Sequence, residues 1–270
     1  MQEKLKRTEL GVGIIGAGRI GALRAQLAVN HPAVRFLALA DRDGARAQAA
    51  AEKCGAHFSS TDNHAVIAYP DVNTVIVSTG EHEHVEPVLE ALAIGKSVLV
   101  EKPLTLTLAD ADRMLDALAK SKGSLRVGYS RRFKRCYLLA KEQLVKGRLG
   151  KVTGVSARIY NSRAQVFQML DRNPGATPIV DSLTYYIDML GWFLEGNPVV
   201  EVWARGKAGI IREAGYACDD VTYAVLTLAD GALVNLAVSF ALPAKYPSLG
   251  YCGRLEIIGS DGIQIGRAHV

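Results

Sequence analysis

Two patterns of hydrophobic and polar positions divide the chain. In the first half, short apolar runs alternate with stretches whose apolar residues recur at helical spacing. The run Val72–Ser78 is β-branched and apolar on both faces, which is typical of a parallel strand buried between helices. Strands that alternate with helices of this length form β-α-β units. The sequence therefore predicts an α/β domain with a parallel sheet over residues 1–124.

The expected elements of this half follow one another in a regular order. Strands are expected at Gly11–Ile15, Val34–Ala40, Val72–Ser78 and Ser97–Val100, and helices at Arg19–Asn30, Gly44–Cys54, Val85–Ile94 and Leu108–Lys122. A further strand, Leu125–Tyr129, ends this alternating series at the expected domain boundary.

The second half has a different pattern, in which alternating strands follow one another without helices between them. Helical stretches are expected at Lys134–Lys146 and Pro178–Leu194, and strands at Val152–Tyr160, Val199–Arg205, Val221–Leu228, Ala232–Phe240 and Arg254–Ile258. Asp230-Gly231 is a hairpin turn signal. This pattern predicts an α+β domain with a large, mostly antiparallel open sheet over residues 125–263.

Composition and charge exclude several classes of protein. The chain has 270 residues, 49% of them hydrophobic and 22% charged, which excludes a disordered chain and a disulfide-dense miniprotein. No apolar run reaches the length of a membrane span, and we expect no membrane partner. The net charge of +5 accompanies no nucleic-acid motif, so we expect no nucleic-acid partner. Four dispersed cysteines without a C-x-x-C pair favour free thiols in a cytoplasmic protein.

A glycine-rich turn predicts a dinucleotide site. Gly16-Ala17-Gly18-Arg19-Ile20-Gly21 fits G-x-G-x-x-G directly after an expected strand and at the start of an expected helix. In this motif Gly16 permits a tight turn, Gly18 lets a pyrophosphate approach the backbone, and Gly21 lets the helix pack on the strand. The free N–H groups of the first helical turn then face the phosphates.

An acidic residue at the end of the next strand agrees with this site. Asp41 lies 20 residues after Gly21, where a carboxylate binds the adenosine ribose hydroxyls of NAD. A carboxylate there repels the 2′-phosphate of NADP, whereas the neighbouring Arg42 can accept it. We expect NAD as the cofactor, with NADP as the alternative.

Four motifs together resemble the glucose-fructose oxidoreductase / inositol dehydrogenase / rhizopine catabolism (Gfo/Idh/MocA) family. They are Gly16–Gly21, Asp41, Glu101-Lys102-Pro103 and Arg132-Phe133, and the resemblance runs from about residue 10 to about residue 262. It implies an N-terminal Rossmann domain, a C-terminal domain with a large open sheet, and NAD(P)-dependent oxidation or reduction of a sugar or cyclitol hydroxyl.

The resemblance also implies site residues in the first domain. In the family, the lysine of E-K-P contacts both the nicotinamide ribose and the substrate, so Lys102 is a candidate for both roles. The segment Ser78–His84 matches a family loop that usually reads T-P-N-x-x-H, although Gly-Glu replaces its Pro-Asn. The expected cofactor-binding residues are Gly16, Gly18, Arg19, Ile20, Gly21, Asp41, Arg42, Ser78, Thr79, His84, Glu101 and Lys102.

The family's second motif, D-x-x-x-H-x-x-D on a helix, is present with one departure. Asp181 and Asp188 match its aspartates, but Tyr185 replaces the histidine. A branch of the family that includes glucose-fructose oxidoreductase also has tyrosine there. Residues four apart share one helix face, so we expect Asp181 and Tyr185 to point the same way. The alternative is an ordinary aromatic residue packed in a helix, as we expect of Tyr186.

These residues predict a chemical mechanism. Removing a hydride from a carbinol carbon requires removal of the hydroxyl proton, and a phenol, which ordinarily titrates near pH 10, needs a cation to favour its phenolate. We expect Tyr185 to be the acid/base and Lys102 to relay the proton and polarise the substrate oxygen. Asp181 is expected to orient the site or accept a hydrogen bond from the substrate.

Weaker candidates complete the prediction. Arg132, Tyr160 and Arg163 are candidates for the wall of a sugar or polyol pocket, from position alone. The Glu81–His84 loop looks like a set of metal ligands, but it lacks a third group and falls on the family's cofactor loop, so we expect no metal. The run Arg131–Arg135 could meet an anionic substrate, but apart from its Arg-Phe pair, which is expected to form site wall or packing, we expect it to be the solvated start of a helix. Family members assemble through the open sheet, so we expect a homo-oligomer.

The end of the chain is a separate expectation. Residues 264–270 match the in-frame translation of a common short-read sequencing adapter. We expect this segment to be a non-native tail and the second domain to be incomplete, with a naturally short C-terminus as the alternative.

The expected function is hydride transfer between NAD(P) and a secondary hydroxyl or ketone. An NAD-dependent glycoside hydrolase of the same fold and a non-catalytic dinucleotide sensor remain the alternatives.

Overall fold

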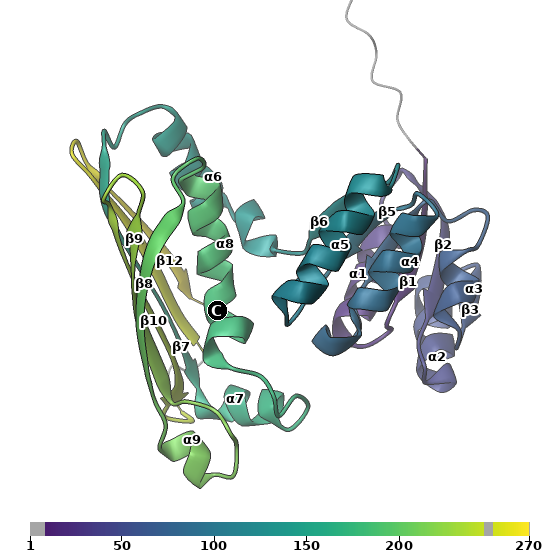
Figure 1. Ribbon diagram of the computed structural model, residues 1–270. Coiled ribbons are helices and arrows are strands. Elements are labelled where there is room, and N and C mark those ends of the chain that lie inside the picture. Colours follow the sequence, from purple (N-terminus) through teal and green to yellow (C-terminus); the bar gives the residue numbers. More distant parts are fainter. Residues whose placement is uncertain (1–8, 246–250, 270) are drawn as a thin grey trace, which may run out of the picture. The chain divides into compact units, whose positions relative to one another are not determined.

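In a computed structural model, which describes residues 9–245 and 251–269, the chain divides between Gly128 and Tyr129 into two units, each with its own sheet (Figure 1). The division lies a few residues after the expected boundary. Strand β6 (Leu125–Val127), which ends the alternating series but lies beyond the expected boundary, pairs in parallel with β5 (Ser97–Val100) of the first sheet. Its backbone hydrogen bonds therefore place it in the first unit.

The first unit is a doubly wound α/β domain. Its six strands lie in the order β3-β2-β1-β4-β5-β6, and all the pairs are parallel. The remaining strands are β1 (Leu10–Ile15), β2 (Val34–Ala40), β3 (Phe58–Ser60) and β4 (Thr74–Val77). The helices are α1 (Arg19–Val29), α2 (Gly44–Cys54), α3 (Asn63–Ile67), α4 (Val85–Ala93) and α5 (Leu108–Lys120).

Helices cover both faces of this sheet, which explains the uninterrupted apolar runs. Neighbouring residues Ile14 and Ile15 are both fully buried, but they belong to different hydrophobic clusters. One cluster includes Ala25 of α1 and Ala51 of α2, and the other includes α4 and α5. Because this order reverses direction between β1 and β4, a crevice is expected beyond the carboxyl ends of these two strands.

The second unit is an α+β domain with a mixed, mostly antiparallel sheet. Its strands lie in the order β12-β11-β7-β10-β9-β8, and only β10 and β7 among the described pairs run parallel. They are β7 (Val152–Ser162), β8 (Val199–Lys207), β9 (Val221–Leu228), β10 (Leu233–Leu242), β11 (Tyr251–Gly259) and β12 (Ile263–His269). The helices are α6 (Arg135–Val145), α7 (Arg163–Leu170), α8 (Thr184–Phe193) and α9 (Ile210–Glu213).

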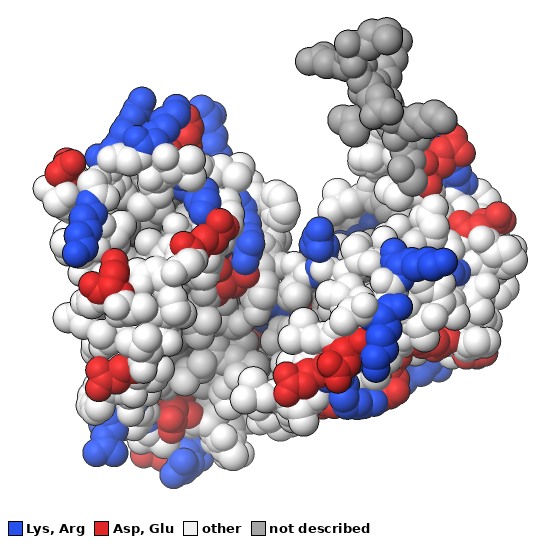
Figure 2. Space-filling view, turned by 45° about the horizontal axis from the view of Figure 1, so that its top comes forward, with Lys and Arg blue, Asp and Glu red and all other residues white. Residues whose placement is uncertain are grey.

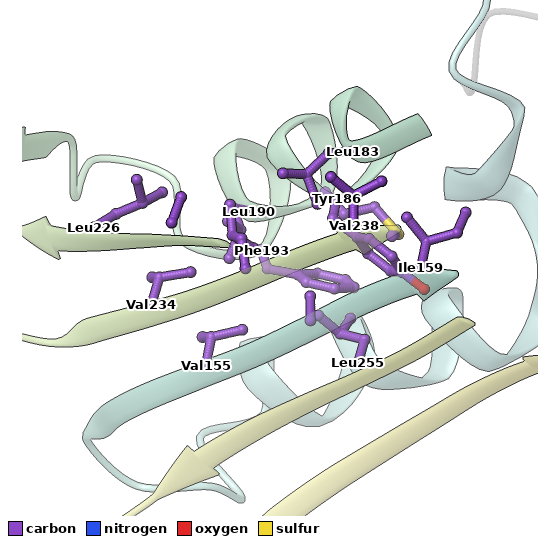
Figure 3. Close-up of a cluster of buried hydrophobic side chains, with 14 of the residues drawn as sticks. Val155, Ile159, Leu183, Tyr186, Leu190, Phe193, Leu226, Val234, Val238 and Leu255 are labelled. Atoms are coloured by element: carbon purple, nitrogen blue, oxygen red, sulfur yellow. The ribbon is translucent and has the colours of Figure 1, made fainter. Parts of the chain in front are cut away.

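Within this unit, α6, α7 and α8 lie on one face of the sheet (Figure 1). The strands alternate accordingly: in β9, Ala224 and Leu226 are buried while Tyr223 and Val225 remain 48% and 39% exposed. Figure 3 shows side chains of α8 packed against the central strands. The labelled members of this core are Val155, Ile159, Leu183, Tyr186, Leu190, Phe193, Leu226, Val234, Val238 and Leu255.

The predicted fold class is confirmed, with differences in individual elements. Strand β3 and helices α3, α7 and α9 were not predicted, because each is short and lacks a strong hydrophobic period. Residues 263–269, most of which fall in the expected tail, form the strand β12 paired with β11. The stretch expected to be one helix from Pro178 begins with a π-helical turn (Ile179–Leu183) before α8.

The surface carries mixed charge. Figure 2 shows acidic and basic side chains interspersed on the face that it presents. In the described residues, no helix is both long enough and apolar enough to cross a membrane.

Candidate functional site

The turn between β1 and α1 needs glycine at two positions and leaves open space at a third. Gly16 has φ +91°, and a Cβ there would lie 2.8 Å from backbone atoms of Ser78 and Thr79. A Cβ at Gly21 would lie 1.8 Å from the Gly16 carbonyl oxygen, so only glycine lets the helix pack this closely. A Cβ at Gly18 would have no heavy atom within 4 Å. The turn therefore leaves the backbone at Gly18 accessible to a ligand.

Helix α1 begins without a side-chain cap. Its N-cap is Gly18, whereas Asp43, Asp62 and Thr107 accept backbone N–H bonds at the starts of α2, α3 and α5. The first N–H groups of a helix have no partner within it, and the helix dipole makes this end positive. The start of α1 is thus suited to bind a phosphate group.

A pocket of about 910 Å³ surrounds this turn within the first unit. Eight of the predicted cofactor-binding residues line it: Gly16, Gly18, Arg19, Ile20, Asp41, Arg42, Ser78 and Thr79. Gly21, His84, Glu101 and Lys102 do not line it. Residues without a predicted role also line the pocket, among them Arg46, Thr61 and Asn63. His82 and Glu83, from the loop that matches the family's cofactor loop, line it as well. The region around Thr61 follows the unpredicted strand β3, so no sequence signal pointed to it.

Asp41 lies in the pocket wall, 7% exposed, at the end of β2. Its Oδ2 accepts a hydrogen bond from the backbone N–H of Ala17 (2.8 Å), and its Oδ1 accepts one from the backbone N–H of Asp43 (2.9 Å). The Arg46 guanidinium is 3.2 Å from the same Oδ1. These contacts fix the carboxylate next to the glycine-rich turn, as a ribose-binding aspartate requires.

The hydroxyl groups of Ser78 and Thr79 lie at the carboxyl end of β4. Both oxygen atoms are buried, and neither has a hydrogen-bond partner among the described residues. A buried polar atom without a partner carries a substantial desolvation cost, which a bound ligand can remove. Together with the open space at Gly18 and the uncapped α1, these hydroxyls fit a dinucleotide.

The Glu101-Lys102-Pro103 turn follows β5 and is braced from two sides. The Glu101 carboxylate is 2.6 Å from the Arg24 guanidinium, and His84, only 1% exposed, donates a hydrogen bond from Nδ1 to the Pro103 carbonyl oxygen (2.9 Å). Glu101 and His84 thus contact protein rather than line the pocket. Lys102 is half-buried at the carboxyl end of β5, the edge of a parallel sheet where ligands bind.

In the second unit, Asp181 and Tyr185 lie one turn apart on a continuous helical segment, both half-buried. Asp181 belongs to the π-helical turn, a form that often occurs at functional sites. Ser182 donates a hydrogen bond to Asp181 Oδ2 (3.0 Å), and Asn161 Nδ2 donates to the Ser182 hydroxyl (3.1 Å). This chain of bonds orients the Asp181 carboxylate.

Tyr185 is surrounded by residues that the sequence did not mark as part of a site. The guanidinium carbon of Arg131, a residue only 8% exposed, is 4.4 Å from the centre of the Tyr185 ring. The Tyr129 ring meets the Tyr185 ring edge-on at 6.1 Å. The interpretation of Arg131 as part of a solvated helix start is wrong, because its guanidinium stacks on tyrosine rings inside the unit. Nothing in the residues next to Arg131 indicates this burial.

The neighbouring Tyr186 has a structural role. It is fully buried in the core, and burial raises the pKa of its phenol far above the ordinary value. Tyr186 therefore remains protonated at neutral pH, as expected of a packed aromatic residue.

Asp188, the second aspartate of the helix motif, binds Arg132. The two side chains form a bidentate ion pair, with Nε 2.8 Å from Oδ2 and Nη2 2.5 Å from Oδ1. Asp188 therefore holds the guanidinium that the sequence analysis considers for substrate contact. The Arg-Phe and Asp motifs are thus linked to each other directly.

Tyr160 and Arg163 are the remaining substrate candidates. Tyr160 alternates with buried Ile159 and lies on the sheet face away from the helices, near Arg158 (5.8 Å to the ring centre). Its neighbour Asn161 is the residue that reaches the helix segment. Arg163 begins α7 and is half-buried. In the described part of the chain no group of three or more His, Cys, Asp or Glu side chains is arranged to bind a metal.

Comparisons with known proteins agree with the division of the chain into two units. Residues 10–129 match a family model described as "Oxidoreductase family, NAD-binding Rossmann fold". Residues 137–264 match the model of the GFO/IDH/MocA C-terminal domain.

Individual relatives carry more specific names. The chain is 32% identical over 263 residues to a myo-inositol 2-dehydrogenase from Thermotoga maritima, covering 93% of this chain and 73% of the relative. It is 29% identical to an inositol 2-dehydrogenase from Rhizobium meliloti, with coverage of 93% and 73%.

Solved structures also match. A probable dehydrogenase from Thermotoga maritima has a TM-score of 0.84 at 30% identity, covering 96% of this chain and 76% of that one. The myo-inositol dehydrogenase of Lactobacillus casei, solved with NAD(H) and myo-inositol, has a TM-score of 0.82 at 26% identity, covering 97% and 75%.

Proposed function

This chain belongs to the GFO/IDH/MocA oxidoreductase family with its NAD-binding Rossmann fold, and we propose the reaction that it catalyses. The protein transfers a hydride between NAD and a secondary hydroxyl or ketone of a cyclitol or sugar. Inositol is the first substrate to test, because relatives at 32% and 29% identity are named inositol 2-dehydrogenases. The pocket around Gly18 is the observation that supports dinucleotide binding most directly.

The proposed roles fall on three side chains. When bound, the nicotinamide supplies the hydride acceptor or donor. Tyr185 removes the hydroxyl proton during oxidation and returns it during reduction. Lys102 polarises the substrate oxygen and relays the proton. Asp181 accepts a hydrogen bond from the substrate, which is supported by its fixed contact with Ser182.

The proposed cofactor preference is NAD over NADP. It is supported by Asp41, whose buried carboxylate is fixed beside the glycine-rich turn by two backbone N–H groups. A negative charge there disfavours the 2′-phosphate of NADP.

Assembly and location are part of the same proposal. We propose a homo-oligomer formed through the uncovered sheet face, where Trp203, Tyr223 and Val225 are 57%, 48% and 39% exposed. Exposed apolar residues gathered on one face are typical of an interaction surface. The cytoplasm is the proposed location, supported by the four free cysteines.

The test is steady-state turnover of the purified protein with NAD and a panel of inositol isomers and sugars. We expect NADH to accumulate in step with a ketone product, and inositol to be among the substrates. Cleavage of a glycoside without net NADH would instead identify a hydrolase. Tight NADH binding with no turnover of any substrate would instead identify a dinucleotide sensor.

A further inference from the structure

Arg42 follows the ribose-binding Asp41 and lines the same pocket. Its side chain is 80% exposed, and its Nη1 is 3.0 Å from Oε1 of Glu83. Glu83 belongs to the short 3₁₀ turn (Glu81–Glu83) that follows β4, and it also lines the pocket. An ion pair therefore bridges two loops that both line the candidate dinucleotide site.

Other charged groups at this rim are also paired. The Arg46 guanidinium is 3.2 Å from Asp41 Oδ1 and 3.5 Å from Asp43 Oδ2. His82 Nε2 is 3.9 Å from the same Glu83 oxygen that Arg42 contacts. Arg46 thus pairs with carboxylates of the β2–α2 loop. The carboxylate partner of Arg42, in contrast, comes from outside this loop.

We propose that Glu83 determines cofactor specificity by holding Arg42 away from the adenosine 2′ position. An arginine beside the ribose-binding acidic residue can accommodate the 2′-phosphate of NADP. Because that phosphate carries a charge of about −1.5 to −2 at neutral pH, it competes with Glu83 for the guanidinium. While Glu83 holds Arg42, the pocket favours NAD, and when the carboxylate is removed, Arg42 becomes available to NADP.

This inference rests on the proposed function, and dinucleotide binding tests it without catalysis. The dissociation constants of NADH and NADPH are measured by nicotinamide fluorescence for wild type, Glu83→Gln, Arg42→Gln and the double variant. Glu9→Gln is the matched control, because Glu9 lies outside the pocket lining and forms a comparable exposed pair with Arg35 at 3.1 Å.

Exposed ion pairs contribute little, so the expected effect is modest but specific. Glu83→Gln is expected to shift the NADPH-to-NADH affinity ratio toward NADPH by about two- to fivefold. Glu9→Gln is expected to leave the ratio unchanged. In the Arg42→Gln background, the Glu83→Gln substitution is expected to have no further effect.

Two results would overturn the inference while leaving the proposed function intact. The first is an unchanged ratio in Glu83→Gln when NADH still binds. The second is a shift that persists without Arg42, because Glu83 would then act only by repelling the phosphate. If the folded wild-type protein binds neither dinucleotide, the proposed function fails together with the inference.

Discussion

The candidate sites of the two units are formed by different parts of the polypeptide. In the first unit the backbone dominates: an open turn at Gly18, the uncapped start of α1, and the N–H groups of Ala17 and Asp43 that fix Asp41. In the second unit side chains dominate. Asp181 is oriented through Ser182 and Asn161, while Arg131 stacks on Tyr185.

This difference determines what a substitution does. A backbone site depends on where glycines allow close approach, so an added methyl group interferes with it directly. A side-chain site depends on networks, so removing one partner leaves another buried group without its bond. Substitutions in the two units should therefore separate binding, turnover and stability.

The largest effect is expected at Tyr185. Tyr185→Phe removes the proposed acid/base group, and general acid–base catalysis contributes roughly 10²–10⁴-fold. We expect kcat to fall by that factor while the dissociation constant of NADH is unchanged, as measured by steady-state kinetics and fluorescence titration.

Tyr186→Phe is the control for this prediction, because the neighbouring ring is fully buried in the core. It should alter thermal stability and leave kcat nearly unchanged. A Tyr185→Phe enzyme that retains wild-type turnover would show that the catalytic base is another group.

The next largest effect is expected on NADH affinity, and it should differ between two glycines of the same turn. Gly18→Ala adds a methyl group in open space, so Tm should be unchanged while NADH affinity falls by roughly 5- to 150-fold. Gly21→Ala places a Cβ 1.8 Å from the Gly16 carbonyl oxygen, so it should lower both Tm and NADH affinity. Calorimetry and fluorescence titration distinguish them. Equal behaviour of the two variants would show that the open space at Gly18 is not the phosphate site.

A smaller effect is expected for the ion pair of the second unit. Arg132→Ala leaves Asp188, whose side chain is 9% exposed, without its bidentate partner. Since Arg132 is itself 39% exposed, we expect a loss of about 1–3 kcal/mol in the free energy of unfolding, less than for a fully buried pair. Denaturant unfolding measures it. Arg35→Ala, which breaks an exposed pair, is the control, and a similar loss in both variants would contradict a specific role for Asp188.

The smallest effect concerns a helix cap in the first unit. Thr107 accepts the backbone N–H of Asp110 (3.1 Å) and donates to Asp110 Oδ2 (2.8 Å). Thr107→Ala should lower Tm at neutral pH by about 2–4 °C and leave NADH binding unchanged.

This cap predicts a pH dependence with a definite sign. The hydrogen bond from Thr107, followed by that from Arg113, lowers the pKa of Asp110 below its usual value of 3.8. A group whose pKa is lowered in the folded state contributes stability above its unfolded pKa, and this contribution is lost as the pH falls through the folded value. The difference in Tm between wild type and Thr107→Ala should therefore narrow below about pH 4. A constant difference across this range would show that the Asp110 charge is not involved.

Much of the first unit could be predicted because its features are local in sequence. The glycine spacing, the apolar strands and the position of Asp41 are each readable within a few residues, and eight of the twelve predicted cofactor residues line one pocket. Short elements such as β3 and α3 were missed, because segments this short are specified mainly by the sheet and helices against which they pack.

The second unit shows where local reading fails. Tyr160 and Asn161 are adjacent, yet only Asn161 reaches the helix segment, because a shift of one residue along a strand reverses the face on which a side chain lies. The burial of Arg131 against Tyr185 and the pairing of Arg132 with Asp188 join residues about 55 positions apart in the chain.

Local sequence was enough to predict the two-part fold class and the glycine-rich turn, because these follow from hydrophobic periodicity and from backbone conformations that only glycine permits. The family followed from the resemblance of its motifs. The pairing of charged side chains, in contrast, could be identified only in the folded domains. These pairs are Glu83 with Arg42, Arg46 with Asp41, and Arg132 with Asp188. Coulombic attraction depends on distance in space, and that distance is fixed only when the sheets and helices have packed.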